Sequence, residues 1–284
     1  MTALHLAEPV ARQRCLGAST TGMRRIEAIL FDLGDTLLDF GLINTLELFA
    51  RGARLAYSYL QQLGHPLPPF RTYHRRQLWA VEWNYFKSHF TRREFNSLDV
   101  LGRLSRRMGH RLTREQTEEL AWLWYTPLKG HASVEPGAGD MLADFRRQGF
   151  RLGIVSNTFV PGEVLDRHLA EEGLLEFFPT RIYSCNVGFR KPETRIFRAA
   201  LDALGARAEA TIFVGDKLKA DILGAQRAGM IAVLKDPCGT TRHKRIRPAY
   251  RIARLSALPA VVRACQAGDG PEASGGAAGA LAGG

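Results

Sequence analysis

The hydrophobic positions between residues 136 and 262 follow two alternating patterns. Short apolar runs such as RLGIV (151–155) and TIFVG (211–215) have the length and composition of buried strands. Between such runs apolar residues recur at helical spacing, as in PETRIFRAALDAL, which Pro192 begins and Gly205 ends. Strands that alternate with helices are typical of an α/β protein with a parallel sheet.

The same pattern predicts further elements on both sides of these runs. Strands are expected at AILF (28–31), TRIYS (180–184), IAVL (231–234) and residues 250–252, and helices at 136–149, 161–169, 220–229 and in the segment up to Val262. The first strand is separated from the others by about a hundred residues, so a long insertion is expected after it.

That insertion, residues 41–129, shows no strand-like alternation. It is rich in Arg, Leu and aromatic residues at helical spacing, and Gly64, Pro66–Pro69 and Gly109 interrupt it. We therefore expect an all-helical domain, inserted between the first strand and the rest of the α/β core. Its four tryptophans are expected to pack inside it: Trp79, Trp83, Trp122 and Trp124.

The two ends of the chain differ from the rest. Residues 1–22 are polar and aperiodic, and Met23 is a second possible start. The tail from Ala267, AGDGPEASGGAAGALAGG, is too poor in large apolar residues to form a core. We expect both ends to be disordered, which leaves residues 23–40 and 130–266 for the α/β core and 41–129 for the helical insertion.

Composition and charge narrow the class of protein. No stretch approaches the roughly 18 apolar residues of a membrane span, and the start lacks the pattern of a secretory signal. The four cysteines form no C-x-x-C pair, which predicts reduced thiols in the cytoplasm: Cys15, Cys185, Cys238 and Cys265.

The net charge of +11 indicates an anionic partner. Residues 41–129 hold 14 Lys and Arg against 7 Asp and Glu, so the insertion carries +7 of this charge. A basic lid would concentrate an anionic substrate, although most of these arginines are expected on a solvated face. A nucleic-acid partner is the alternative, favoured by TRHKRIRP (241–248), but no known nucleic-acid-binding module is visible.

Polar residues follow the predicted strands. Asp32 follows AILF, Ser156 follows GIV, Lys191 lies in GFRKPETRIF, and Asp216 and Asp221 lie in FVGDKLKAD. Because the carboxyl ends of parallel strands share one edge of a sheet, we expect these side chains to converge. Together they suit phosphoryl transfer, with a carboxylate nucleophile, acidic ligands for a divalent cation, and a lysine that stabilises negative charge.

The motifs FDLGDTL, IVSNT, GFRKPETRIF and FVGDKLKADILGAQRAGM resemble, in this order, the four motifs of the haloacid dehalogenase-like (HAD) hydrolase superfamily. The resemblance covers about residues 27–262, and the position of the insertion resembles the subgroup with a helical cap after the first motif. It implies a Rossmann-like core with helices on both faces of the sheet. It also implies Mg²⁺ dependence and phosphatase activity through an aspartyl-phosphate.

The resemblance also implies roles for individual residues. Asp32 matches the nucleophile and a metal ligand, and the backbone carbonyl of Gly34 matches a second ligand. Ser156, Asn157 and Lys191 match the contacts to the substrate phosphate, with Lys191 also catalytic. The acidic metal motif is matched by Asp216 and Asp221. The implied substrate is a small anionic phosphorylated metabolite.

Gly34 departs from the family pattern, because most phosphatases of the superfamily carry Asp there as general acid and base. Loss of such help lowers a rate by roughly 10²–10⁴. Three interpretations stay open. The enzyme works without this acid, Asp35 replaces it although its side chain should point away, or the protein binds phosphorylated ligands with little or no turnover.

A 2-haloacid dehalogenase is a further alternative within the resemblance. Cleavage of a carbon–halogen bond needs no metal, and such relatives lack the paired acids of the last motif. The presence of both Asp216 and Asp221 therefore favours phosphoryl chemistry.

Overall fold

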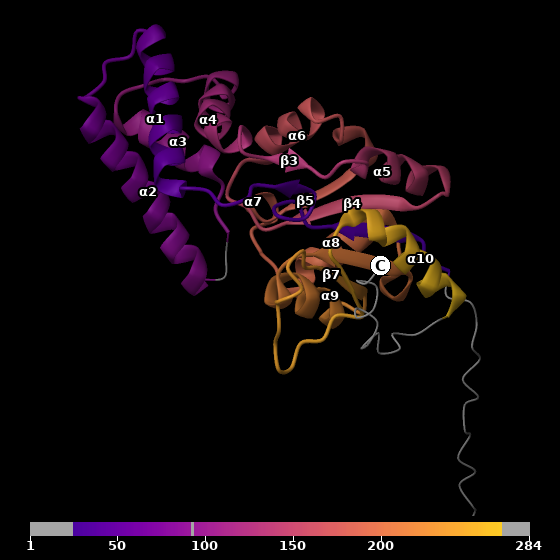
Figure 1. Cartoon of the computed structure of the whole chain (residues 1–284). Coiled ribbons are helices and arrows are strands. Elements are labelled where there is room, and N and C mark those ends of the chain that lie inside the picture. Colours follow the sequence, from indigo (N-terminus) through magenta and orange to yellow (C-terminus); the bar gives the residue numbers. More distant parts are fainter. Residues whose placement is uncertain (1–24, 92–93, 269–284) are drawn as a thin grey trace, which may run out of the picture.

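The computed structural model describes residues 25–91 and 94–268 and has a six-stranded parallel sheet at its centre (Figure 1). Across the sheet the strands are β5 (Thr180–Tyr183), β4 (Arg151–Ser156), β1 (Ala28–Phe31), β6 (Thr211–Gly215), β7 (Ile231–Lys235) and β8 (Tyr250–Ile252). Each lies where the sequence pattern predicts a strand. The α/β class with a Rossmann-like sheet is confirmed.

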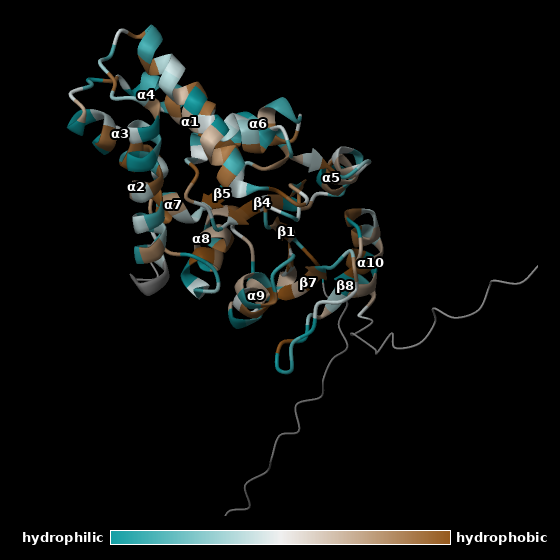
Figure 2. Ribbon diagram, turned by 60° about the vertical axis from the view of Figure 1, so that its left-hand side comes forward, coloured by the Kyte–Doolittle hydropathy of each residue, from teal (hydrophilic) through white to brown (hydrophobic). Residues whose placement is uncertain are grey.

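Both faces of the sheet are covered, because successive residues of each strand point to opposite sides. Ile29 and Phe31 of β1 belong to one apolar cluster, and Ala28 and Leu30 belong to the other. The first cluster includes α5 (Ala138–Arg147), α6 (Gly162–Glu171) and α10 (Leu258–Ala267), and the second includes α8 (Thr194–Leu204) and α9 (Leu223–Arg227). Figure 2 shows the strands in brown between these helices.

Short elements complete the core. They are β2 (Leu38–Asp39) paired antiparallel with β3 (Ser133–Val134), the four-residue helix α7 (Ser184–Val187), 3₁₀ turns at Leu175–Phe177, Ala208–Ala210 and Leu255–Ala257, and a π-helical turn at Leu218–Ile222. The β2–β3 pair joins the two chain segments that lead into and out of the helical insertion.

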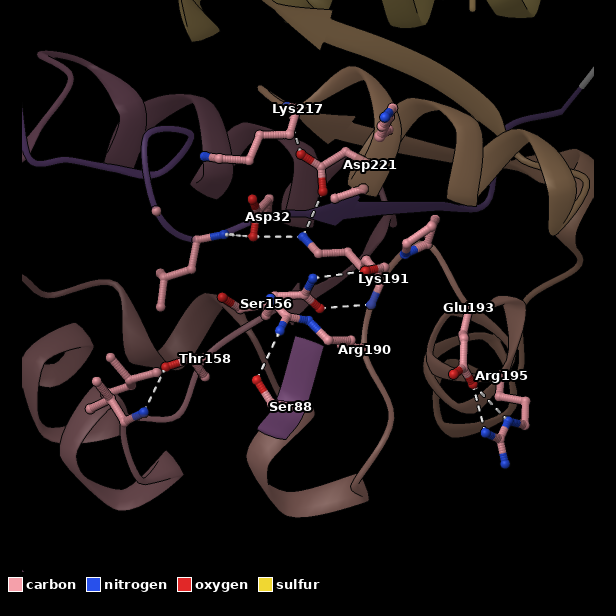
Figure 3. Close-up of a pocket in the computed structure, with 18 of the residues that line it drawn as sticks. Asp32, Ser88, Ser156, Thr158, Arg190, Lys191, Glu193, Arg195, Lys217 and Asp221 are labelled. Atoms are coloured by element: carbon pink, nitrogen blue, oxygen red, sulfur yellow. Dashed lines mark hydrogen bonds and ion pairs between the residues drawn. The ribbon is translucent and has the colours of Figure 1, made fainter. Parts of the chain in front are cut away.

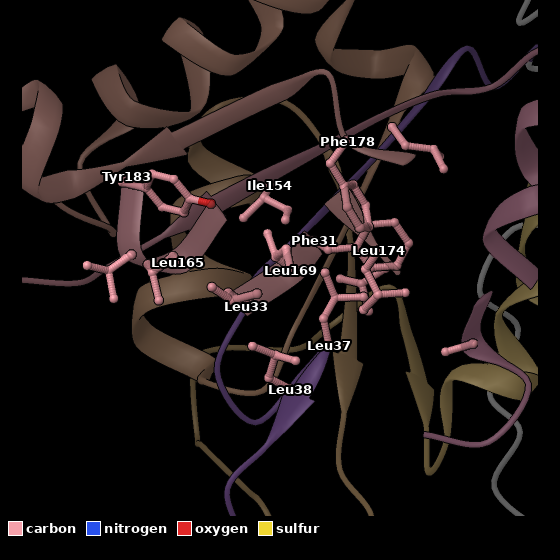
Figure 4. Close-up of a cluster of buried hydrophobic side chains, with 14 of the residues drawn as sticks. Phe31, Leu33, Leu37, Leu38, Ile154, Leu165, Leu169, Leu174, Phe178 and Tyr183 are labelled. Atoms are coloured by element: carbon pink, nitrogen blue, oxygen red, sulfur yellow. The ribbon is translucent and has the colours of Figure 1, made fainter. Parts of the chain in front are cut away.

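The turn after β1 is anchored in the apolar core. Phe31 packs edge to face on Phe178, with ring centroids 5.8 Å apart. Leu33, Leu37 and Leu38, on the far side of Asp32, are buried in the same cluster, as Figure 4 shows. The polar residues of this turn are therefore held between apolar residues that cannot move without opening the core.

The sheet has its topological switch at β1, which lies between β4 and β6. From β1 the chain continues to β4 and β5 on one side and then crosses back to β6 on the other side, so a crevice opens at the carboxyl end of β1. Such a crevice is the usual ligand site of an open α/β sheet.

The insertion consists of helices throughout its described residues. They are α1 (Thr45–Gln62), α2 (Phe70–Thr91), α3 (Ser97–Arg107) and α4 (Arg114–Lys129). Asn44 and Asn96 cap α1 and α3, and Thr113 and Gln116 form a capping box on α4. The division of the chain into a core and a cap at residues 41 and 129 stays a prediction about domain boundaries.

Helix α4 rests on α6 of the core. Ion pairs join Arg114 to Glu163 and Lys129 to Glu171, with N–O distances of 3.2 and 2.8 Å. Tyr125 Oη lies 2.8 Å from Nδ1 of the buried His168, which is a hydrogen bond between the two helices. Part of the insertion's basic charge is thus used in its contact with the core.

The expectation that all four tryptophans pack inside the insertion is wrong for two of them. Trp122 and Trp124 are buried, but Trp79 and Trp83 are 63% and 45% exposed and stack on each other along the surface of α2. Apolar residues occur on all sides of this 22-residue helix, so its sequence does not indicate which side is covered.

Several predictions about the ends fall largely outside the described residues. These are the disorder of residues 1–22, the second start at Met23, and the tail, of which only Ala267, in α10, and Gly268 are described. Of the cysteines, Cys185 and Cys238 have free thiols, Cys265 is buried, and Cys15 is not described. No described helix is long and apolar enough to cross a membrane.

Candidate active site

The polar residues predicted at the strand ends meet at the crevice beside β1. A cavity of about 1010 Å³ is lined by Asp32, Gly34, Ser156, Asn157, Lys191 and Asp221. Asp216 is not among the lining residues, but its carboxylate lies within 4.8 Å of those of Asp32 and Asp221. The structure therefore brings together all seven residues named from the sequence.

Lys191 is the centre of this arrangement (Figure 3). Its Nζ lies 2.7 Å from Oδ1 of Asp32 and 2.7 Å from Oδ1 of Asp221, and its side chain is 1% exposed. Asp32 Oδ1 also accepts a hydrogen bond from the N–H of Leu33 at 2.7 Å. These contacts fix one oxygen of Asp32, while the side chain keeps 10% of its surface exposed at the cavity.

Burial and charge shift the pKa values of this cluster. Burial raises the pKa of Asp32 to about 7; the charge of Asp221 adds to the rise and that of Lys191 opposes it. Burial alone would lower the pKa of Lys191, but the carboxylates of Asp221 and Asp32 outweigh it and hold that pKa above its usual value. The buried cluster thus contains more carboxylates than cations, and its negative charge is only partly balanced.

Asp221 is placed by the π-helical turn that follows β6. Its Oδ2 accepts a hydrogen bond from the N–H of Lys217 at 2.8 Å, and the residue is fully buried. Gly215 makes this position possible, because a Cβ there would lie 2.5 Å from Cβ and Cγ of Asp221. Single π turns within helices occur frequently at functional sites.

The three carboxylates suit a hard divalent cation. One oxygen from each of Asp32, Asp216 and Asp221 lies within 4.8 Å of the others. Oδ1 of Asp216 is buried and has no hydrogen-bond partner in the described part of the chain, while its Oδ2 pairs with Lys217 Nζ at 2.7 Å. Carboxylate oxygens are the ligands that Mg²⁺ prefers, and a cation would supply the missing positive charge. The donor set therefore fits the metal that the sequence predicts.

Asn157 is hydrogen-bonded to the backbone of Lys191. Its Oδ1 accepts from Lys191 N at 2.7 Å and its Nδ2 donates to Lys191 O at 2.9 Å. These two bonds tie the end of β4 to the loop that carries Lys191. Ser156 is buried next to Asn157 and also lines the cavity.

Gly34 leaves space where a side chain would project. A Cβ at this position would meet only Phe40 Cε2, at an ordinary contact distance of 3.7 Å. The neighbouring Asp35 has a φ of 57° and does not line the cavity, and its Oδ2 lies 3.4 Å from Lys217 Nζ. Asp35 thus contacts the cavity through Lys217, which lines it and also pairs with Asp216, and the orientation of Asp35 away from the site stays a prediction.

Some lining residues were not anticipated from the sequence. Arg190 precedes Lys191 and lines the cavity, and its Nη1 lies 3.4 Å from Ser88 Oγ on α2 of the insertion, as Figure 3 shows. Arg190 Nε also lies 3.6 Å from the buried Glu94. The position of Arg190 next to Lys191 in the sequence was a signal that it lies at the site. Ser88 and Glu94 lie near Arg190 only because the insertion folds over the cavity.

Comparison with known proteins identifies the family. The model of the haloacid dehalogenase-like hydrolases matches residues 26–229. The chain therefore belongs to the haloacid dehalogenase-like hydrolase family.

Individual relatives support this assignment over different lengths. A glyceraldehyde 3-phosphate phosphatase of Methanothermobacter thermautotrophicus is 42% identical over 101 residues, which is 35% of this chain and 43% of that protein. YfnB of Bacillus subtilis, solved bound to magnesium, is 25% identical, with a TM-score of 0.53 over 84% of this chain and 99% of that one. A 2-haloacid dehalogenase of Pseudomonas syringae pv. Tomato DC3000, 22% identical with a TM-score of 0.58 over 84% and 98% of the two chains, shares the fold.

Proposed function

We propose that the chain is a Mg²⁺-dependent phosphatase that hydrolyses a small anionic phosphomonoester through an aspartyl-phosphate on Asp32. The coarser statement, that it is a hydrolase acting on phosphoric monoesters, rests on its family and its phosphatase relatives. The observation that carries the proposal is the ion pairing of Lys191 with both Asp32 and Asp221 at a cavity edge where three carboxylates converge.

In this proposal the cation is held by Asp32, the backbone carbonyl of Gly34, Asp216 and Asp221. When bound, it offsets the repulsion between an anionic nucleophile and an anionic substrate. Lys191 orients Asp32, favours its ionised form against the effect of burial, and stabilises charge on the transferred group. Ser156 binds phosphoryl oxygens, and Asn157 positions Lys191 beside them.

The reaction has two steps. A carboxylate oxygen of Asp32 attacks phosphorus and the ester P–O bond breaks, leaving a phosphoryl group on Asp32. Water then attacks this phosphorus, the bond to Asp32 breaks, and phosphate leaves. Cationic side chains around the cavity favour the anionic substrate and product: Arg190, Lys191, Arg195, Lys217, Lys219 and Arg227.

A second candidate is a weakly active or non-catalytic protein that binds phosphorylated ligands. It is favoured by Gly34, which supplies no acid or base, and by Asp35, which does not line the cavity and is paired with Lys217. The haloacid dehalogenase and nucleic-acid alternatives receive less support, because neither activity requires the three converging carboxylates.

Cytoplasmic location completes the proposal. It is supported by the free thiols of Cys185 and Cys238, since secreted proteins usually pair theirs.

Hydrolysis of p-nitrophenyl phosphate with Mg²⁺ or EDTA tests the function. We expect wild-type activity that requires Mg²⁺, and a loss of about 10⁴-fold or more in Asp32→Asn because the nucleophile is removed. Asp202→Asn is the matched control, since Asp202 is exposed on α8 and outside the cavity, and it should keep full activity.

Gly34→Asp separates the two candidates. The space at Gly34 accepts a side chain, so this variant should be about 10²–10⁴-fold faster if only the acid and base is missing. Activity confined to Gly34→Asp would favour the binding protein. Activity in wild type that survives Asp32→Asn would contradict the proposed mechanism.

A further inference from the structure

A second hollow lies inside the helical insertion, and nothing in the reaction described above uses it. This chamber has a volume of about 400 Å³ and lies between α1, α2, α3, α4 and the loop 159–161 of the core. Its wall is apolar, with Leu48, Phe49, Leu101 and Val160 among its members. An apolar cavity of about 150 Å³ is enough for a benzene ring, so this chamber accommodates a larger ring system.

The chamber adjoins the active-site cavity. Tyr125, Leu128 and Val160 line both hollows. The two hollows are therefore neighbours, and a ligand that spans them would place its phosphate among the cations at the strand ends and its organic group among the apolar side chains of the insertion.

Polar groups of the chamber wall are largely engaged elsewhere. Trp124 Nε1 donates to Gln77 Oε1 at 2.6 Å, and Tyr125 Oη is bonded to His168. The one charged residue among the lining residues is Glu82, which is exposed. The carboxylate of Glu82 would repel a second phosphate or a carboxylate of the ligand, so the chamber suits an uncharged apolar group.

The missing acid at Gly34 restricts the leaving group independently. An alkoxide is strongly basic and requires a proton as it departs, whereas a phenol ionises with a pKa of about 10 and departs as a phenolate much more readily. A site without a general acid is therefore matched to an aryl ester.

From these two observations we infer that the substrate is an aryl phosphomonoester whose aromatic group, larger than a single ring, occupies the chamber. The inference rests on the proposed phosphatase function and adds the substrate class. Asp32 attacks phosphorus, the bond to the aryl oxygen breaks, and the phenolate keeps the electron pair and takes a proton from water. Water then attacks the aspartyl-phosphate, releases phosphate, restores the carboxylate and gives its proton to solvent.

A consequence of the missing base is that the second step limits turnover. The phenolate should appear in a burst of about one equivalent per enzyme, followed by slow release. Intact mass spectrometry of the quenched enzyme should detect one added phosphoryl group, which is absent in Asp32→Asn. In Gly34→Asp the burst should shrink, because the new carboxylate activates water.

A panel of four phosphomonoesters with Mg²⁺ tests the substrate class. We expect kcat/KM to decrease from 2-naphthyl to phenyl, cyclohexyl and glycerol 3-phosphate. Phenyl and cyclohexyl phosphate differ mainly in leaving-group basicity, and we expect a ratio of about 10² or more between them. That ratio should fall in Gly34→Asp, which restores the acid. Cyclohexyl and glycerol phosphate differ mainly in apolar surface, and their ratio reports on the chamber.

Ile43→Gln tests the chamber itself, because Ile43 lines the chamber and not the active-site cavity. We expect KM for 2-naphthyl phosphate to rise about 10-fold and KM for glycerol 3-phosphate to stay unchanged. Leu123→Gln is the control, since Leu123 is half-buried like Ile43 but lines neither hollow. Circular dichroism of both variants checks that they fold.

The outcomes separate the inference from the function beneath it. Equal or better turnover of glycerol 3-phosphate by wild type would overturn the aryl substrate and leave the phosphatase standing. Equal effects of Ile43→Gln and Leu123→Gln would overturn the role of the chamber. No Mg²⁺-dependent hydrolysis of any ester by wild type or Gly34→Asp would overturn the phosphatase function and the inference with it.

Discussion

The two hollows of the molecule are formed in opposite ways. The active-site cavity takes its key groups from loops at the ends of β1, β4 and β6, whose backbones are fixed by the ladders of one sheet. The chamber takes its wall from side chains of four helices and one loop, and no sheet holds it in shape. In the proposed function, chemistry is thus placed on the rigid part of the fold, and the inferred substrate selection on a part where single substitutions change the shape.

The two hollows also differ in what stabilises them. Around Lys191 charge must balance, because a buried ion without a partner is costly. In the chamber the apolar side chains need only van der Waals contacts, and the few polar atoms need hydrogen bonds. Removing one group should therefore have unequal consequences in the two places.

The largest expected effect is at Lys191. Lys191→Met leaves Asp32 and Asp221 facing each other without the cation between them, and we expect the free energy of unfolding to fall by about 3–5 kcal/mol. Urea denaturation measures this change. Lys244→Met is the control, since Lys244 is exposed, and a loss below about 1 kcal/mol at Lys191 would contradict the balance described here.

A smaller effect is expected in the chamber wall. Trp124→Phe keeps one aromatic ring but removes the one that carries Nε1, which leaves Oε1 of the buried Gln77 without its donor and costs about 1–3 kcal/mol. The same substitution at the exposed Trp79 should change stability by less than about 0.5 kcal/mol. Equal losses in the two variants, measured by urea denaturation, would show that the hydrogen bond to Gln77 contributes nothing.

The contrast between the hollows also explains which features the sequence predicts. Asp32, Ser156 and Asp216 stand at the end of an apolar run or directly after it. Because the strands of a parallel sheet all end at the same edge, the place of these residues in the fold follows from the sequence. The chamber follows no such rule, because it depends on how four helices pack. For the same reason the exposure of Trp79 and Trp83 was not predicted, although both tryptophans were correctly placed on a helix.

Within the active site, sequence motifs identify residue types but not their contacts. The pattern gave Asn157 as a substrate ligand, whereas both its amide atoms contact the Lys191 backbone. The double ion pair of Lys191 likewise depends on Gly215, whose missing side chain makes room for Asp221. Such close approaches arise from the tertiary fold and leave no periodic signal.

The smallest expected effect concerns the link between the two hollows, at His168. This side chain is fully buried on α6 and bonded to Tyr125, which lines both. Burial lowers the pKa of His168 below its ordinary 6.5, with Glu172 opposing the shift and Lys129 adding to it. The unfolded chain therefore binds this proton first as the pH falls, so the contribution of His168 to stability is complete above pH 6.5 and is lost below it.

Replacing His168 by Gln keeps a hydrogen-bonding group beside Tyr125 and removes the titration. Below pH 6.5 the wild-type free energy of unfolding should lose up to about 1.4 kcal/mol per pH unit relative to His168→Gln. Urea denaturation at several pH values measures the difference, in which the titration of Asp32 cancels because both proteins contain it. His243→Gln, at an exposed position, should run parallel to wild type. If the stability of His168→Gln also runs parallel to that of wild type, the buried site beside Tyr125 tolerates a charged imidazole.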